Sequence, residues 1–116
     1  MANLINLKEI QDARGSLTVI QDQVNFSIRR IFYISNVPPG CKRGGHRHKK
    51  TRMGLVSVCG GCVVDVYGAE GVDSFHLTSS SKLLILEPDD WHVMRGFSKG
   101  CVLRGLASEE YDSEDY

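Results

Sequence analysis

Two histidines separated by one residue, His46 and His48, lie inside the basic stretch Arg43-Gly44-Gly45-His46-Arg47-His48-Lys49-Lys50. Imidazole suits proton transfer near neutral pH, because its unperturbed pKa is about 6.5. Alternate side chains of an extended strand share a face, so both imidazoles should point together while Arg47 and Lys49 point the other way. The stretch predicts one wall of a site, and the alternative is a pair of surface histidines on a solvated basic strand.

The other two histidines have different surroundings. His92 follows the turn residues Pro88-Asp89-Asp90 at the start of a later predicted strand. A closed sheet is expected to bring it opposite the first pair. His76 is expected to be a surface residue of its strand.

The four cysteines form no strong metal or redox motif. The segment Cys59-Gly60-Gly61-Cys62 is compatible with half a zinc site or a redox pair, but the sequence holds no second such pair. Its two glycines lie between Val-rich segments and predict a hairpin turn. Structural cysteines are therefore favoured.

Short strands separated by turns are expected to position these residues. No long segment keeps a helical period, and turn signals recur about every ten residues, which is typical of a β-sandwich or barrel. The predicted strands are 4–10, 17–20, 28–35, one that carries both His46 and His48, 55–59, 62–67, 74–77, 83–86, 91–95 and 101–106. The acidic end, 108–116, is expected to form either one short helical turn or a frayed tail.

The alternation along the predicted strand 28–35 separates two candidate site residues. Arg30 shares a face with Phe32, whereas Tyr33 lies on the other face. A regular strand therefore does not aim Arg30 and Tyr33 at the same pocket.

Composition limits the classes of partner. The 116 residues predict one domain, 1–116, and the 14 basic residues are balanced by 14 acidic ones. A local basic strand in a neutral protein favours a phosphorylated small molecule over nucleic acid. The N-terminus lacks the apolar core of a signal peptide and no apolar run is long enough to span a membrane, so no membrane partner and a cytoplasmic location are expected.

Several motifs together resemble one family. They are Asp12-Ala13-Arg14-Gly15-Ser16-Leu17, Ile28-Arg29-Arg30-Ile31-Phe32-Tyr33-Ile34, the basic histidine stretch, Trp91-His92, and Leu106-Ala107-Ser108-Glu109-Glu110-Tyr111-Asp112. With these motifs the chain resembles the cupins and, more closely, the nucleotide-sugar 3,4-ketoisomerases of the WxcM-like group. The resemblance implies an all-β cupin jelly-roll of antiparallel sheets, and a homodimer whose N-terminal strands are exchanged between subunits.

The resemblance also implies an isomerase of deoxysugar and glycan biosynthesis that converts a dTDP-4-keto-6-deoxyhexose into its 3-keto isomer, with no metal or other cofactor. A ketone at C4 acidifies the hydrogen on C3, so the reaction needs a base, an enediolate and an acid. His46 and His48 are the expected proton-transfer groups, and Tyr33 is an expected donor to the enediolate. The expected substrate contacts are Arg14, Arg30, Arg43, Arg52, Trp91 and His92.

One position departs from the family pattern. Related isomerases and metal-binding cupins generally have a glutamate four residues beyond the second histidine, where this chain has Arg52. A positive charge there would weaken binding of a divalent metal and, if it faced inward, lower the pKa values of the histidines. Two alternatives stay open: a catalytically silent nucleotide-sugar binding cupin, and a metal-dependent cupin oxygenase that uses His46, His48 and His92.

Overall fold

Eleven strands and one short 3-10 helix make up residues 2–116, the part of the chain that the computed structural model describes; Met1, the first residue of the predicted domain, lies outside it. The strands are β1 (Asn3–Asn6), β2 (Glu9–Asp12), β3 (Gly15–Thr18), β4 (Arg30–Ser35), β5 (Arg43–His46), β6 (Met53–Cys59), β7 (Cys62–Gly68), β8 (Gly71–Leu77), β9 (Lys82–Leu86), β10 (Trp91–Arg95) and β11 (Val102–Ala107). The helix is η1 (Ser113–Asp115).

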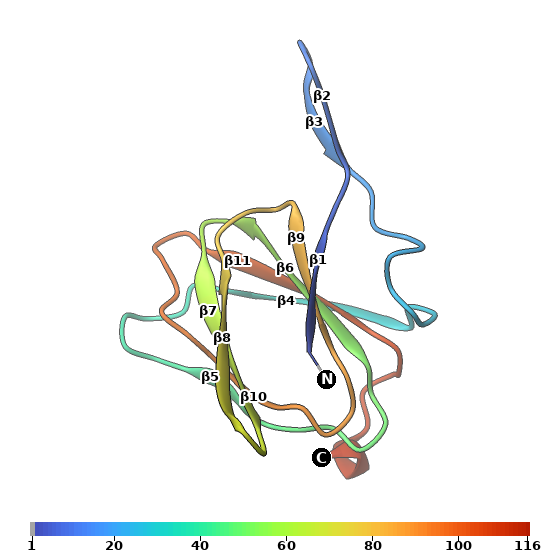
Figure 1. The fold of residues 1–116 in the computed structure, drawn as a ribbon. Helices are drawn as coiled ribbons and strands as arrows, with labels where there is room; N and C mark the ends of the chain where they lie inside the picture. Colours follow the sequence, from blue (N-terminus) through green and yellow to red (C-terminus); the bar gives the residue numbers. More distant parts are fainter. Residues whose placement is uncertain (1) are drawn as a thin grey trace.

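The strands form two antiparallel sheets and one separate hairpin (Figure 1). The first sheet has the order β1-β9-β6-β11-β4 and the second has the order β5-β10-β7-β8, while β2 pairs only with β3. Most neighbours in each sheet are not consecutive in sequence, so the chain crosses repeatedly between the layers. The predicted all-β jelly-roll of antiparallel sheets is confirmed.

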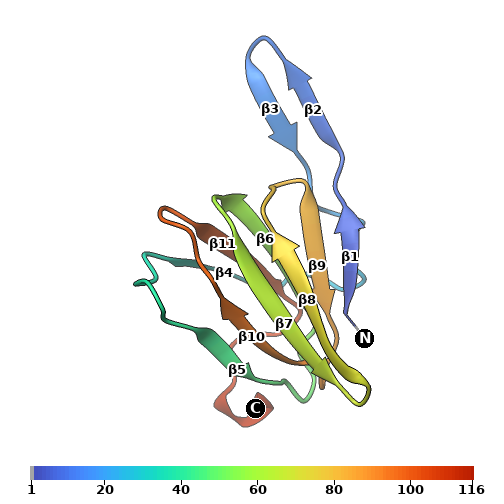
Figure 2. The ribbon, with the colours of Figure 1, turned by 60° about the vertical axis from the view of Figure 1, so that its left-hand side comes forward.

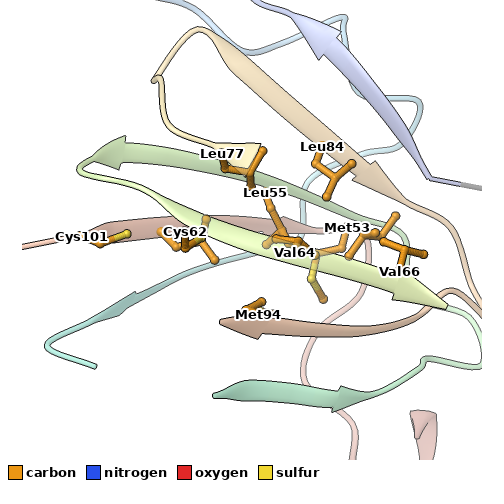
Figure 3. Close-up of a cluster of buried hydrophobic side chains, with 11 residues drawn as sticks. Met53, Leu55, Cys62, Val64, Val66, Leu77, Leu84, Met94 and Cys101 are labelled. Carbon is orange, nitrogen blue, oxygen red and sulfur yellow. The ribbon is translucent and has the colours of Figure 1, made fainter. Parts of the chain in front are cut away.

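The main core lies between the two sheets (Figure 3). Its buried side chains come from both layers: Met53, Leu55, Leu84, Leu86 and Leu103 from the first sheet, and Cys62, Val64, Val66, Leu77 and Met94 from the second. Leu55, Val64, Leu77, Leu84 and Leu103 have no exposed surface. The two sheets are therefore held face to face by burial of apolar surface.

Strand β9 explains why the sequence shows four apolar residues in a row. Leu84 and Leu86 face the main core, whereas Leu83 and Ile85 face a second cluster on the outside of the first sheet. Val24, from the long loop that precedes β4, covers that outer cluster. Because both faces of β9 are buried, its pattern is continuous instead of alternating.

The predicted hairpin across Gly60-Gly61 was wrong. Strand β6 pairs with β9 and β11, whereas β7 pairs with β8 and β10, so the turn carries the chain from one sheet to the other. A glycine pair marks a reversal but does not decide whether the next strand pairs with the previous one. Cys59 is exposed and Cys62 is buried, and burial raises the pKa of Cys62 to about 12. Reactive thiols need the opposite shift, which agrees with a structural role.

The hairpin of β2 and β3 projects from the body of the molecule (Figures 1 and 2). All four residues of β2 are exposed, and β3 is nearly as open. Two of its large apolar side chains, Ile10 and Leu17, are 49% and 59% exposed. The hairpin therefore presents apolar surface that this chain does not cover.

The C-terminal segment forms the short helical turn, one of the two expected alternatives. The side chain of Asp112 accepts a hydrogen bond from the Glu114 amide and caps η1. Asp115, at the end of η1, is buried with 4% of its surface exposed. No helix among residues 2–116 is long and apolar enough to cross a membrane.

Candidate active site

A cavity of about 360 Å³ is lined by three of the four histidines of the chain. Its walls come from β4, β5, β10 and the C-terminal segment. The lining residues are Arg30, Phe32, Tyr33, Ile34, Arg43, Gly44, His46, His48, Met53, His92, Met94, Tyr111 and Tyr116. The volume is in the range of small-molecule sites.

The three histidine rings are packed against one another. The ring centroids of His46 and His48 are 5.1 Å apart, those of His46 and His92 are 5.3 Å apart, and those of His48 and His92 are 6.3 Å apart. His46 and His92 are direct cross-strand partners on β5 and β10. As predicted, the folded sheet brings His92 opposite the histidine pair.

The two histidines do not share one regular strand, as the alternation argument had assumed. Strand β5 ends at His46, and His48 lies two residues beyond it, before the bend at Lys49 and Lys50. Gly44 and Gly45 have φ values of 82° and 80°. Gly45 forms a bulge, because Gly44 and His46 on either side of it pair with consecutive residues of β10 while Gly45 has no partner there. Both imidazoles line the cavity, as expected, but the alternation of a regular strand is not what places His48 there.

Contacts with Asp115 place His48 instead. Oδ2 of Asp115 lies 3.0 Å from Nδ1 of His48, and the same oxygen accepts a hydrogen bond from the Thr51 hydroxyl. Oδ1 accepts a 2.8 Å hydrogen bond from the amide of Lys50. The sequence reasoning missed Asp115, because nothing local distinguishes it from the other acidic residues of the segment.

Two more aromatic residues of the cavity were also missed. The ring of Tyr116 lies 4.8 Å from that of His46 and 4.7 Å from that of His48, and Tyr111 lines the cavity beside it. Both tyrosines follow the last strand, in a segment for which the sequence predicted either a turn or a tail. Their positions depend on the docking of that segment against the histidines.

The hydrogen bonds at Nδ1 define the tautomers of two histidines. Nδ1 of His48 donates to the Asp115 carboxylate, and Nδ1 of His92 donates to the carbonyl oxygen of Asp90 at 3.0 Å. In each neutral ring the lone pair is then on Nε2. Both Nε2 atoms are buried and have no hydrogen-bond partner among residues 2–116. Two basic nitrogens are thus available to a ligand in the cavity.

Burial lowers the pKa of all three histidines. For His46 the neighbouring His48 adds to this effect, and for His92 both other histidines do. For His48, burial is the main cause and Arg30 lowers the pKa further, whereas Asp115 raises it in part. The neutral, basic forms therefore persist to lower pH than the usual value of about 6.5.

Arg30 and Arg43 bring positive charge to the cavity. The guanidinium of Arg30 lies 5.8 Å from the ring centroid of Phe32 and 5.9 Å from that of Tyr111, and its buried Nε has no partner among residues 2–116. Arg43 lines the cavity from β5 and is exposed. Tyr33 borders the cavity but is 68% exposed, and the alternating exposure along β4 puts it on the face opposite Arg30, as predicted.

Three predicted contact residues do not line the cavity. The side chain of Arg14 is 90% exposed in the β2–β3 turn and pairs with Asp12 at 2.7 Å. Arg52 forms a 2.7 Å ion pair with Glu87, so its charge does not lie among the histidines. Trp91 is on the opposite face of β10 from His92 and packs its ring 5.0 Å from that of Tyr67.

Within residues 2–116, no group of three or more His, Cys, Asp or Glu side chains is arranged to hold a metal ion. Arg52 occupies the position at which metal-binding cupins place a carboxylate, and it pairs with Glu87.

An antiparallel jelly-roll with histidines on the wall of its cavity defines a cupin-type protein. The family described as "FdtA: WxcM-like, C-terminal" matches residues 1–116, and the chain belongs to this family. The TDP-4-oxo-6-deoxy-alpha-D-glucose-3,4-oxoisomerase of Aneurinibacillus thermoaerophilus is 40% identical over 115 residues, which are 97% of this chain and 83% of that protein. The resemblance drawn from the motifs is confirmed.

Solved structures agree in fold and class. A histidine-to-asparagine mutant of the 3,4-ketoisomerase QdtA from Thermoanaerobacterium thermosaccharolyticum, in complex with TDP-4-keto-6-deoxyglucose, matches with a TM-score of 0.95 and 34% identity over 98% of this chain and 84% of that chain. The WlaRB TDP-quinovose 3,4-ketoisomerase from Campylobacter jejuni matches with a TM-score of 0.94 and 32% identity, covering 99% of this chain and 90% of that chain.

Proposed function

We propose that this protein is a sugar-nucleotide 3,4-ketoisomerase that converts a dTDP-4-keto-6-deoxyhexose into its 3-keto isomer. The proposal rests on one observation above the others: a cavity in a member of this family places three imidazoles against one another, two of them with free basic nitrogens. The relatives named above are TDP-sugar 3,4-ketoisomerases. The expected cytoplasmic location stays a prediction.

His46 and His48 are the proposed proton-transfer groups. Because C3 and C4 are bonded to each other, one imidazole can serve both carbons while the other moves the hydroxyl proton from O3 to O4. Their lowered pKa values keep both rings neutral near pH 7, which is the state that accepts a proton. His92 lies close enough to both to contact the sugar.

The arginines are proposed to bind the negative charges of the ligand and of the enediolate. Arg30 lies deepest, and its unpartnered Nε supports a role near the reacting oxygens. Arg43 is exposed at the cavity and suits the diphosphate, because a guanidinium matches phosphate oxygens. Tyr33 is proposed to act at the rim of the cavity, where its exposed side chain is free to approach the ligand.

Isomerisation is tested by proton NMR of dTDP-4-keto-6-deoxyglucose incubated with the protein in D2O, with and without a chelator. We expect a 3-keto product formed at an equal rate in both samples, with deuterium at C4 to the extent that the proton held on the base exchanges with D2O. An incubation without protein controls for spontaneous rearrangement. Binding of the substrate without turnover would favour the silent binding cupin, and activity lost to the chelator and restored by a metal would favour a metalloenzyme.

We also propose a homodimer in which the β2–β3 hairpin reaches the partner subunit. The hairpin exposes Ile10 and Leu17, and it lies at the opposite end of the molecule from the C-terminal turn (Figure 2). Arg14, in the turn of this hairpin, is therefore remote from the cavity of its own chain. In the proposed dimer, Arg14 binds the ligand of the partner subunit.

Subunit complementation tests this arrangement. Arg14→Ala and His48→Asn are each expected to be nearly inactive. An equimolar mixture allowed to exchange subunits should recover about a quarter of wild-type activity, because about half of the dimers are mixed and one of the two sites in each mixed dimer is intact. Light scattering should give a dimer for all three samples. A mixture that stays inactive although its subunits exchange, or a monomeric protein, would contradict the proposal.

A further inference from the structure

The C-terminal turn places a buried carboxylate directly behind one of the two proposed proton-transfer groups. We propose that Asp115 is a positioning residue that makes His48, and not His46, the base for the carbon-bound proton. This inference rests on the proposed ketoisomerase function and assigns separate roles to the two histidines.

Asp115 is held in one orientation by contacts on both of its oxygens. Oδ1 accepts from the amide of Lys50 at 2.8 Å, while Oδ2 accepts from the Thr51 hydroxyl and lies 3.0 Å from Nδ1 of His48. The carbonyl of Asp115 accepts a further 2.6 Å hydrogen bond from the amide of Lys49. The carboxylate cannot rotate without losing several of these bonds, so it is a fixed acceptor for His48.

The carboxylate is charged in this environment. Burial raises the pKa of Asp115, but hydrogen bonds from Thr51, Lys50 and His48 outweigh it and leave the pKa below its usual value. An ionised carboxylate only accepts hydrogen bonds, so His48 must carry its proton on Nδ1. Nε2 of His48 is then a free lone pair that is buried in the cavity wall.

The other two histidines have no such partner. Nδ1 of His92 bonds to the neutral carbonyl of Asp90, and His46 has a hydrogen bond with the backbone of Gly44. An imidazolium at His46 gains no adjacent carboxylate, and one at His92 gains only the Coulombic attraction of Asp90, without a hydrogen bond to its carboxylate. His48 is thus the ring best able to hold a proton between its removal and its return.

Charged and titratable groups from four parts of the chain face His48. The titratable and charged groups that face it are Asp115 and Tyr116 from the C-terminal segment, Arg30 from β4, His46 from β5 and His92 from β10. Of these, Asp115 alone raises the pKa of His48, and Arg30 lowers it. Removal of the carboxylate should therefore make His48 a weaker base.

The proposed isomerisation moves one proton from C3 to C4 and another from O3 to O4. Nε2 of His48 takes the proton from C3, the electrons of that bond form the C3–C4 double bond, and the negative charge moves onto O4. A proton passes from O3 to O4 through His46. His48 then returns its proton to C4 as the C3–O3 bond becomes a carbonyl, and both histidines regain their initial states.

Asp115→Asn is the direct test. The Lys50 amide requires an oxygen at the Oδ1 position, so the new amide group must turn its NH2 toward His48 and force the proton onto Nε2. We expect kcat to fall at least about 100-fold, with KM changed by no more than about threefold, because a histidine in the wrong tautomer cannot accept the substrate proton. The acid limb of the residual pH–rate profile should move to lower pH, because the group that raises the pKa of His48 is gone.

Asp112→Asn is the matched control. Asp112 caps the same turn, and its carboxylate bonds the Glu114 amide and pairs with Lys50, without contacting a histidine. We expect kcat to stay within about twofold of wild type with an unchanged acid limb. If the control loses as much activity as Asp115→Asn, the effect is that of a disordered segment and the proposal is wrong.

The tautomer can also be measured in the unmodified protein. Long-range proton–nitrogen NMR of histidine-labelled protein, with His48 assigned by His48→Asn, should show neutral His48 protonated at Nδ1. Protonation at Nε2 would overturn the proposal even if Asp115→Asn failed to fold. A wild-type protein without turnover would refute the proposed function, whereas an active wild type with an equally active Asp115→Asn would refute only this inference.

Discussion

Replacing His48 by asparagine is expected to lower kcat about 1,000-fold, because a positioned general acid or base contributes 100- to 10,000-fold to such reactions. Asparagine is close in size to part of the ring but cannot take up a proton at neutral pH. Affinity for TDP should change by no more than about threefold, because the arginines that we assign to the phosphates remain. Steady-state kinetics and calorimetric titration with TDP measure the two quantities.

His76→Asn is the control for this substitution. His76 is exposed on β8 and does not line the cavity, so the variant should keep wild-type kinetics. Exchange of the C3 hydrogen with D2O adds a sharper comparison. His48→Asn should lose both exchange and product formation, whereas His46→Asn should still exchange at C3 while forming little product. Persistent exchange in His48→Asn would show that another group removes the carbon-bound proton.

Gly105→Ala is expected to destabilise the protein by about 2–3 kcal/mol, which corresponds to a fall in melting temperature of roughly 10 °C. Gly105 on β11 is the cross-strand partner of Phe32 on β4, and a Cβ at Gly105 would overlap the Phe32 ring. The ring would have to leave its place in the cavity wall. Activity should therefore fall together with stability. Thermal unfolding monitored by circular dichroism, with kinetics at a lower temperature, measures both.

Gly68→Ala provides a matched glycine in another strand. The nearest atom to a Cβ there is the carbonyl oxygen of Gly71, at 3.9 Å, so a change within about 0.5 kcal/mol is expected. Adding Phe32→Leu to Gly105→Ala should recover part of the lost stability by making room for the new methyl group. Equal melting temperatures for Gly105→Ala and wild type would mean that β4 and β11 separate more easily than their close packing indicates.

Much of the fold was predictable because the alternation of side chains along strands and the residues of turns are local patterns in the sequence. The alternation along β4 correctly separated Arg30 from Tyr33, since side-chain direction in a strand repeats every two residues. The bounds of β10 were correct because Pro88 and the following turn mark its start. The spacing of His46 and His48 predicted one wall of a site, and both residues line the cavity. Their assignment to proton transfer came from the family resemblance.

Other features depended on contacts between distant parts of the chain. The turn at Gly60-Gly61 is equally compatible with a hairpin and with a crossing between sheets, and only the partners of β6 and β7 decide between them. Arg52 is drawn away from the histidines by Glu87, which is remote in sequence. Neither outcome has a local signature.

The sequence by itself determined the all-β class, the family and the imidazoles that carry the proposed chemistry. Tertiary structure alone decided which carboxylate lies behind which imidazole. His48 and Asp115 are separated by 67 positions, and the helical turn that carries Asp115 is too short to show a period. Alternation and turn signals act over a few residues, whereas this pair is formed by docking of the chain end against the β5–β10 wall, so no local pattern contains it.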